Sequence, residues 1–128
     1  MRLLLDTNIA LWAITDDPRL GSRAATLIAD PGNVVCVSAA SLWEIAIKHA
    51  LRRGEMPVSG TEARRYFDQS GYRTLSIGPE HVLGVERLPR IHHDPFDRLL
   101  VAQAIEEGCR LLTRDSVLPR YSDFVLAV

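Results

Sequence analysis

The sequence contains little cysteine, a single lysine and no long hydrophobic run. Its two cysteines, Cys36 and Cys109, lie in separate apolar stretches and lack the spacing of a metal-binding pair, so they are predicted to be buried thiols in a reducing compartment. No apolar run approaches the roughly 20 residues that cross a membrane. The three leucines before Asp6 form a run too short for a signal-peptide core. These absences predict a soluble, cytoplasmic protein with no membrane segment.

Charges of the two signs are almost balanced. Fifteen Lys and Arg residues against 16 Asp and Glu residues give a net charge of −1 at pH 7. Bulk charge therefore does not indicate a nucleic-acid-binding protein, and such binding would need a local patch. Hydrophobic residues make up 47% of the 128 positions, which is enough for a core in a single domain over residues 1–128.

Apolar strand-like segments alternate with amphipathic helical segments along the chain. Strands are expected at residues 2–5, 33–37, 72–77, 109–113 and 124–128. Helices are expected at residues 9–14, 22–29, 41–53, 61–70, 79–88 and 95–107. This alternation predicts an α/β layer fold with a mostly parallel sheet.

Two of the expected helices carry clear end signals. Ser41 and Glu44 match the capping-box pattern S-x-x-E, and Gly54 would end the helix that they begin. Asp94 stands before a proline suited to the first helical position, so Asp94 is predicted to be an N-cap. Gly108 is predicted to end that helix.

Four acidic residues fall where strands end or helices begin. Asp6 follows the first strand, and Glu44 lies in the first turn of the helix after the second strand. Asp97 lies in the first turn of the helix before the fourth strand, and Asp115 follows that strand. Because loops at the carboxyl ends of parallel strands share one edge of the sheet, we expect the four carboxylates to meet there.

Each acid also has a structural alternative. Asp6, or Asn8 in its place, could cap the first helix; Glu44 could complete a capping box, Asp97 could complement a helix dipole and Asp115 could stabilise a turn. These alternatives do not explain the convergence. Two carboxylates about 4 Å apart repel by roughly 4 kcal/mol at an effective dielectric near 20, and a shared proton or a cation relieves that cost. Hard cations such as Mg²⁺ or Mn²⁺ favour oxygen ligands and can promote phosphodiester hydrolysis.

The stretches around these acids resemble a known family. They are LLLDTNIALW at 3–12, SAASLWEIAIKHALRRG at 38–54, HHDPFDRLLVAQA at 92–104 and LLTRD at 111–115. In this order they resemble a PIN-domain ribonuclease, and more narrowly the VapC-type toxin of a type II toxin–antitoxin system. The resemblance covers essentially the whole chain. It implies a three-layer α/β/α fold around a central, mostly parallel sheet of five strands.

The resemblance also implies an endoribonuclease that depends on Mg²⁺, or on Mn²⁺, and acts on RNA, usually tRNA or rRNA. The family's four catalytic and metal-binding acids correspond to Asp6, Glu44, Asp97 and Asp115. Asp6 and Asp97 are expected to hold one cation directly, and the other two acids partly through water. An activated water would attack the phosphorus in line, leaving 5′-phosphate and 3′-hydroxyl ends. Asp94, one helical turn from Asp97, is assigned as a cap first.

Four residues beside the acids are predicted to bind the substrate: Thr7, Asn8, Arg98 and Thr113. The first two and Thr113 could instead hydrogen-bond the acids themselves. Local turns and strand ends would equally explain Thr7, Asn8 and Thr113. A surface ion pair would equally explain Arg98.

Three apolar residues, Leu11, Trp12 and Trp43, are predicted to line a groove for a partner helix. The resemblance implies that a cognate antitoxin occupies this groove, often with an arginine reaching toward the acids, and that the chain forms a homodimer. Stacking on RNA bases and burial in the core are the alternatives for the tryptophans. His92 and His93 have no cysteine or third histidine at a suitable spacing, so they are predicted to be ordinary loop residues and not zinc ligands.

Two other classes compete with the endoribonuclease. One is a non-catalytic interaction module that retains the fold. The other is a phosphoryl-transfer enzyme with Asp6 as a covalent nucleophile. Dehalogenase-like phosphatases need a second acid two positions later, where this chain has Asn8. Receiver domains need a lysine late in the chain, and the single lysine here, Lys48, is too early.

Overall fold

The structure is a computed structural model that describes residues 1–52 and 56–128. Its strands are β1 (Arg2–Leu5), β2 (Val34–Ser38), β3 (Arg73–Leu75), β4 (Arg110–Thr113) and β5 (Val125–Ala127). Its helices are α1 (Thr7–Ile14), α2 (Ser22–Ala29), α3 (Ala39–Ala50), α4 (Gly60–Gln69), α5 (Pro79–Gly84) and α6 (Pro95–Glu107). Short 3-10 turns are η1 (Pro18–Leu20), η2 (Val85–Arg87) and η3 (Leu118–Tyr121). None of the helices described is long and apolar enough to cross a membrane.

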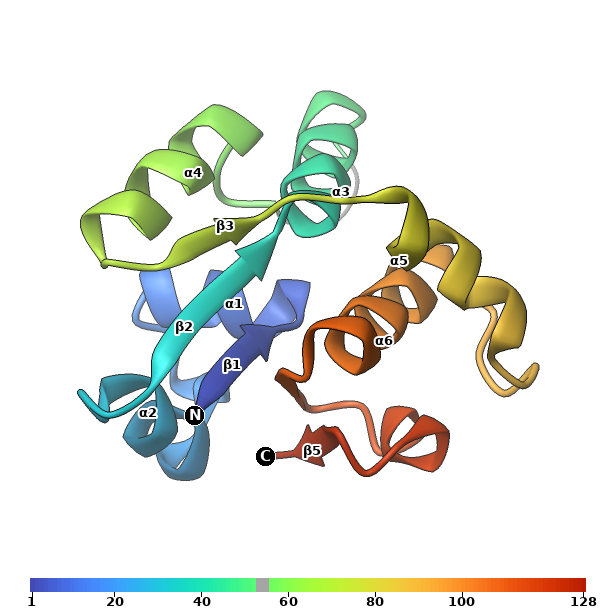
Figure 1. Cartoon of the computed structure of the whole chain (residues 1–128). Helices are drawn as coiled ribbons and strands as arrows, with labels where there is room; N and C mark the ends of the chain where they lie inside the picture. Colours follow the sequence, from blue (N-terminus) through green and yellow to red (C-terminus); the bar gives the residue numbers. More distant parts are fainter. Residues whose placement is uncertain (53–55) are drawn as a thin grey trace.

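The five strands form one sheet in the order β3-β2-β1-β4-β5. All four pairings are parallel, which is stricter than the mostly parallel sheet expected from the sequence. β1 is central, so its carboxyl end lies between those of β2 and β4 (Figure 1). The residues that follow these three strands therefore meet at one edge of the sheet.

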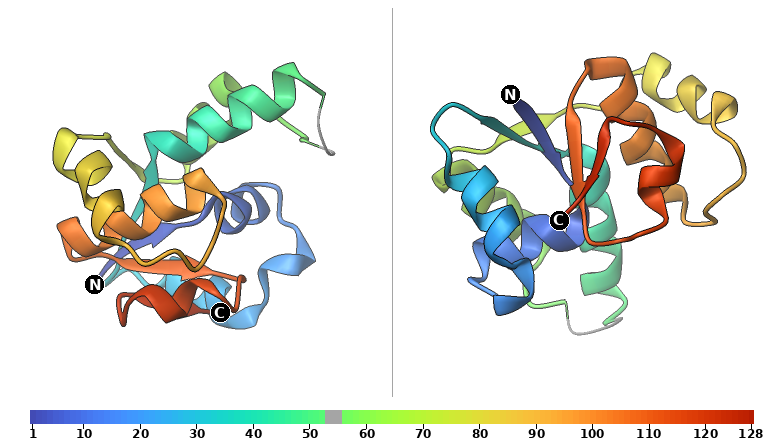
Figure 2. Two further views of the ribbon diagram at one scale, coloured as in Figure 1. Left: turned by 90° about the vertical axis from the view of Figure 1, so that its right-hand side faces the viewer. Right: turned by 90° about the horizontal axis from the view of Figure 1, so that it is seen from below.

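Helices cover both faces of the sheet, as the three-layer prediction required. Side chains alternate along β1: Leu3 and Leu5 pack in one core cluster with Phe67 of α4, and Leu4 packs in the other with Leu100 of α6. In Figure 1, α1, α2 and α4 lie on one side of the sheet and α5 and α6 on the other. The two further views in Figure 2 show the same layers. Both cysteines are buried and unpaired, as predicted.

The start of α3 differs from the prediction. Ser38, the last residue of β2, is the N-cap, and its hydroxyl accepts a 3.0 Å hydrogen bond from the backbone of the second residue of α3. The predicted capping box of Ser41 and Glu44 is therefore wrong. Both residues lie within α3, and their side chains are buried. Because α3 begins directly after β2, at Ala39, these two residues lie about one turn further from the helix start than predicted. α3 ends at Ala50 with Leu51 as its C-cap, before the predicted end at Arg53, and the predicted stop at Gly54 lies outside the described residues.

Other element boundaries shift by a few residues. α1 begins at Thr7, because Asp6 rather than Asn8 is its cap and accepts a 2.8 Å hydrogen bond from the backbone N–H of Ile9. The edge strands β3 and β5 are shorter than predicted, and the helix predicted at 79–88 divides into α5 and η2. Asp94 caps α6 as predicted.

Gln103 is a buried polar residue that ties α6 to the sheet. Its side-chain oxygen accepts a 2.5 Å hydrogen bond from the Ser38 hydroxyl, and its amide donates to the Ser76 carbonyl at 3.3 Å. Because Ser38 caps α3, this contact fixes the start of α3 relative to α6. These are the two helices that carry Glu44 and Asp97.

Gly108 ends α6 in a left-handed conformation with φ +66°, and no atom lies within 4 Å of the position that a Cβ would take. Gly108→Ala should therefore destabilise the fold by about 1 kcal/mol through backbone strain alone. Gly84 provides a matched control, because its φ is −59° and a Cβ there would meet the Ala102 side chain at an ordinary 3.5 Å. Gly84→Ala should be neutral or stabilising by up to about 1 kcal/mol. Urea unfolding measures both, and equal destabilisation would contradict this reasoning.

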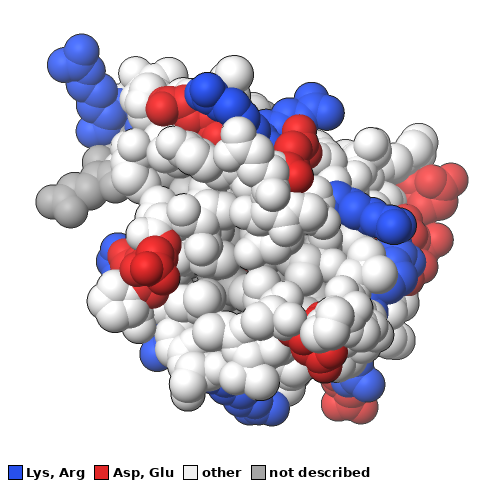
Figure 3. All heavy atoms as spheres, turned by 90° about the vertical axis from the view of Figure 1, so that its left-hand side faces the viewer, with Lys and Arg blue, Asp and Glu red and all other residues white. Residues whose placement is uncertain are grey.

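Charged side chains of both signs are mixed on the surface. Figure 3 shows the side of the molecule on which α2 and α4 lie, with scattered Lys, Arg, Asp and Glu around an uncharged middle. No patch of one sign dominates this view, in keeping with the net charge of −1. On this face, a polyanionic ligand would have to depend on local contacts rather than on a broad positive surface.

Candidate active site

Asp6 lies at the carboxyl end of the central strand and is 7% exposed. Besides capping α1, its carboxylate accepts a hydrogen bond from the hydroxyl of Thr113, at the end of β4. Burial raises the pKa of Asp6, and the nearby carboxylates of Glu44 and Asp115 raise it further, although the hydrogen bonds oppose the change. Asp6 is therefore held in place by neutral donors and faces other acids.

Glu44 is buried on the inner face of α3, and both of its oxygens are occupied. The hydroxyl of Thr7 donates to Oε1 at 2.7 Å and also lies 2.9 Å from the hydroxyl oxygen of Ser41. Lys48, one turn further along α3, donates to Oε2 at 2.6 Å. The chain's single lysine thus holds one acid of the cluster in a fixed orientation.

Asp97 lies in the first turn of α6, and its side chain is 22% exposed. Burial first, and then the nearby carboxylates, raise the pKa of Asp97 to about 7. The acids responsible are Asp94, Asp6 and Glu44, in that order. At neutral pH this carboxyl group is therefore close to half protonated unless a cation compensates the charge.

Asp115 follows β4, and both of its oxygens are also engaged. Oδ1 accepts a 2.8 Å hydrogen bond from the backbone of Val117, and Oδ2 lies 2.9 Å from Nε2 of His92. His92 is also 3.8 Å from Asp97 Oδ2. Ligand atoms of His92, Asp97 and Asp115 lie within 4.8 Å of one another. His92 lies in the loop before α6, as predicted, but its ring contacts two acids of the site, which the sequence analysis did not anticipate.

The backbone fixes the tautomer of His92. The N–H of Asp94 donates to Nδ1 of the ring at 3.0 Å, so Nδ1 carries no proton. The neutral ring then carries its proton on Nε2 and donates it to Asp115. A metal ion at Nε2 would require the proton to move to Nδ1, against the Asp94 N–H. In this geometry His92 positions Asp115 and is not itself a metal ligand.

The acidic cluster, defined as Asp6, Glu44, Asp97 and Asp115, has the composition of a site for a hard divalent cation. Its donors are carboxylate oxygens from four different segments, the ligands that Mg²⁺ and Mn²⁺ favour. Among residues 1–52 and 56–128, only Glu44 of these four has a lysine or arginine partner. Within the described chain no lysine or arginine compensates the charges of the other three, and a bound cation relieves such a concentration of negative charge.

The residues predicted to bind substrate separate into two groups. Thr7 and Thr113 are buried and their hydroxyls contact Glu44 and Asp6, which agrees with the alternative that they hydrogen-bond the acids rather than the substrate. Arg98 donates to the carbonyl of Val85, in η2. Asn8 is exposed in the first turn of α1, and its contact with substrate stays a prediction.

The three predicted partner residues also differ in exposure. Leu11 is 6% exposed and belongs to the core, so the prediction that it lines a partner groove is wrong. Trp12 is half-buried, with the Arg19 guanidinium 5.2 Å above its ring. Trp43 is 59% exposed and lines a groove between α3 and α4. A partner contact at the two tryptophans stays a prediction.

Thr7 provides a direct test of how the cluster is supported. Thr7→Val keeps the shape but removes the donor to Glu44, so it should lower the rate of cleavage about tenfold, as is typical when the support of a site carboxylate is lost. It should also destabilise the fold by about 1–3 kcal/mol, because a buried carboxylate oxygen loses its partner. Thr7→Ser restores the hydroxyl and should recover most of both. Cleavage and unfolding assays of the two variants measure the difference.

A parallel five-stranded sheet with acids gathered at its carboxyl edge defines the class of this protein. The chain belongs to the PIN domain family, whose model matches residues 3–123. It is 32% identical over 114 residues to Ribonuclease VapC22 of Mycobacterium tuberculosis, covering 88% of this chain and 86% of that protein.

Solved structures show the same fold at lower identity. The VapBC2 complex from Rickettsia felis, bound to a promoter DNA fragment, matches with a TM-score of 0.69 and 18% identity over 98% of this chain and 97% of that one. VapC20 of Mycobacterium tuberculosis, a sarcin–ricin loop cleaving toxin, matches with a TM-score of 0.63 and 16% identity over 94% and 97%. A toxin–antitoxin complex from Klebsiella pneumoniae matches with a TM-score of 0.63 and 18% identity over 98% and 96%.

Proposed function

We propose that the chain is a divalent-cation-dependent endoribonuclease and the toxin of a toxin–antitoxin pair. The observation that carries the proposal is the meeting of Asp6, Glu44, Asp97 and Asp115 at one edge of the sheet, three of them without a lysine or arginine partner among the described residues. The relative named Ribonuclease VapC22 supports RNA as the substrate. A structured RNA such as tRNA or rRNA is the finer proposal, supported by VapC20, which cleaves the sarcin–ricin loop.

Mg²⁺, or Mn²⁺ in its place, is the proposed cofactor, with the four acids as its ligands. A divalent cation bound there would lower the pKa of a water molecule and polarise a phosphoryl oxygen. The chain's own contribution is to hold the carboxylate oxygens in position before substrate arrives. The groups that do so are the hydroxyls of Thr7 and Thr113, the ammonium of Lys48 and the imidazole of His92.

An antitoxin and a second copy of the chain are the proposed protein partners. Two of the structural neighbours are toxin–antitoxin complexes, which supports a cognate antitoxin for this chain. The exposed Trp43 and the half-buried Trp12 remain candidate contacts for it. The homodimer is proposed from the family resemblance.

The test is to incubate the purified chain with total RNA and to map the new ends. We expect cleavage that stops with EDTA, resumes with Mg²⁺ or Mn²⁺, and leaves 5′-phosphate and 3′-hydroxyl ends. Asp6→Asn should abolish it while still capping α1, since asparagine is an equally good N-cap. Asp16→Asn, an exposed acid outside the cluster, is the matched control and should cleave normally. Cleavage that persists in EDTA, or 2′,3′-cyclic phosphate ends, would exclude this chemistry, and no cleavage at all would favour a non-catalytic module.

A further inference from the structure

Trp43 and Phe96 form an aromatic pair beside the acidic cluster. Trp43 immediately precedes Glu44 on α3, and Phe96 immediately precedes Asp97 on α6. Their ring centroids are 5.1 Å apart in an edge-to-face arrangement with an interplanar angle of 70°. Trp43 is nevertheless 59% exposed, the largest fraction for any large hydrophobic side chain in the described chain. The contact orients the indole and leaves much of it open to solvent.

Charge alone cannot attract RNA to this site. The acidic cluster repels phosphates, and the chain as a whole carries a net charge of −1. Stacking of a base on an aromatic ring does not depend on the charge of the protein, because every base has a π face. An exposed indole next to the acids therefore supplies a binding contribution that the acids themselves lack.

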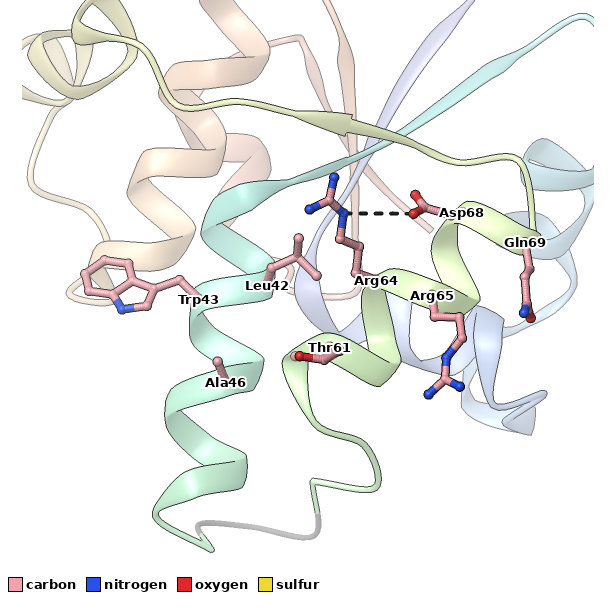
Figure 4. Close-up of a pocket in the computed structure, with 9 residues that line it drawn as sticks. Leu42, Trp43, Ala46, Thr61, Arg64, Arg65, Asp68 and Gln69 are labelled. Atoms are coloured by element: carbon pink, nitrogen blue, oxygen red, sulfur yellow. Dashed lines mark ion pairs between the residues drawn. The ribbon is translucent and has the colours of Figure 1, made fainter.

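A groove of about 650 Å³ lies between α3 and α4, on the side of α3 opposite the indole. Trp43 and Ala46 belong to its α3 wall, and Arg64 and Arg65 project from α4 (Figure 4). Arg64 is 3.9 Å from the carboxylate of Asp68, and both side chains are more than half exposed. Such a pair contributes little to stability, so its guanidinium can turn to another anion at small cost. The groove thus combines apolar residues, Leu42 and Ala46, with arginines that can bind phosphates.

We propose that Trp43 and this groove bind a single-stranded segment of the RNA next to the cleaved phosphate. One base stacks on Trp43, and the backbone crosses α3 so that its phosphates reach Arg64 and Arg65. Figure 4 shows the indole projecting from the side of α3 away from α4, so the strand has to cross the helix. The inference rests on the proposed endoribonuclease function and specifies its substrate as an unpaired nucleotide, in a loop rather than within a duplex.

Trp43 fluorescence tests the stacking directly. The chain has two tryptophans, so Trp12→Phe leaves Trp43 as the sole reporter, and Asp6→Asn prevents cleavage during the titration. An oligoadenylate of roughly eight nucleotides, within the usual site size, should quench Trp43 emission. A GC-rich RNA duplex of the same length, which stays paired under these conditions, should quench it much less. Circular dichroism of each variant checks that the fold is retained.

Affinity measurements in the Asp6→Asn background give the size of the effect. Trp43→Ala should weaken binding of the oligoadenylate by about 5- to 140-fold, the range expected for one lost stacking contact. Trp43→Phe should recover part of this loss, and Leu83→Ala, a similarly exposed residue on α5, should have no effect. Arg65→Gln should lower the slope of log affinity against log salt by about 0.7, the value for one phosphate contact on a single strand.

The outcomes separate this inference from the proposed function. If wild type cleaves RNA but Trp43 emission does not respond and Trp43→Ala binds normally, the stacking inference is overturned and the endoribonuclease stands. If Trp43→Ala changes only the oligomeric state in sedimentation, this surface is a protein interface and the inference is again overturned. If the oligoadenylate quenches Trp43 but wild type cleaves no RNA, stacking is supported and the proposed activity fails.

Discussion

Asp97→Asn should make the cation-free protein more stable at about pH 8 and at the same time reduce cleavage by about a thousandfold or more. The loss of activity follows from the loss of one ligand of the proposed cation site. The gain in stability follows from the raised pKa of Asp97, about 7, which arises mainly from burial and then from neighbouring acids. An asparagine keeps the shape of the side chain and removes the repelled charge.

The sign of the pH dependence follows from linkage. The ordinary pKa of Asp97 is 3.8 and its pKa in the fold is about 7, so between these values the folded protein binds more protons than the unfolded chain. The free energy of unfolding therefore falls as the pH rises from about 4 to about 7, by at most about 4 kcal/mol. Asp97→Asn should remove the contribution of this residue to the slope, and the raised pKa of Asp6 should leave a slope of the same sign.

Urea unfolding in EDTA across this pH range measures both proteins. Glu106→Gln, an exposed acid on the same helix, is the control and should follow wild type in stability and cleavage. Adding Mg²⁺ at about pH 8 should stabilise wild type more than Asp97→Asn, because a bound ion stabilises only the form that binds it. If Asp97→Asn were less stable than wild type in EDTA at about pH 8, the repulsion argued here would not exist.

Much of the fold could be predicted from the sequence because its strands are nearly continuous apolar runs. β1 and α2 were predicted residue for residue, and the parallel sheet follows from the alternation of strands with helices. Once the sheet is parallel, Asp6 and Asp115 have to lie at the same edge, since Asp6 directly follows β1 and Asp115 is two residues after the end of β4. The gathering of the acids was therefore predictable from strand ends alone, although their distances were not.

The side-chain contacts that depend on tertiary packing could not be predicted from the sequence. Ser41 and Glu44 fit a capping pattern, but the residue that caps the helix is Ser38. Glu44 instead accepts a hydrogen bond from Thr7 of α1, because α3 packs against α1. The sequence around Leu11 does not show which face of α1 is buried. Leu11 belongs to the core because its face of α1 packs against the sheet. A local pattern contains no information on contacts between segments that lie far apart in the chain.

His92 is the residue of the site that the sequence analysis missed. Its substitution is the second change from which we expect a large effect. Its partner Asp115 is 23 residues away, so no ligand spacing marks it. The available signal was its position just before the helix that carries Asp97, at the same edge of the sheet. His92→Ala should lower both the affinity for Mg²⁺ and the rate of cleavage by about 10- to 100-fold, because Asp115 loses the donor that orients it.

Two substitutions at this position separate orientation from bulk. Glutamine can present an amide N–H near the place of Nε2, whereas asparagine is too short to reach Asp115 and can replace only Nδ1. His92→Gln should therefore recover a large part of Mg²⁺ affinity and cleavage, and His92→Asn should not. His93→Ala, the exposed neighbour, should match wild type in calorimetric Mg²⁺ titration and in cleavage. Equal loss in His92→Gln and His92→Asn, with the fold intact, would mean that the imidazole acts through something other than the hydrogen bond to Asp115.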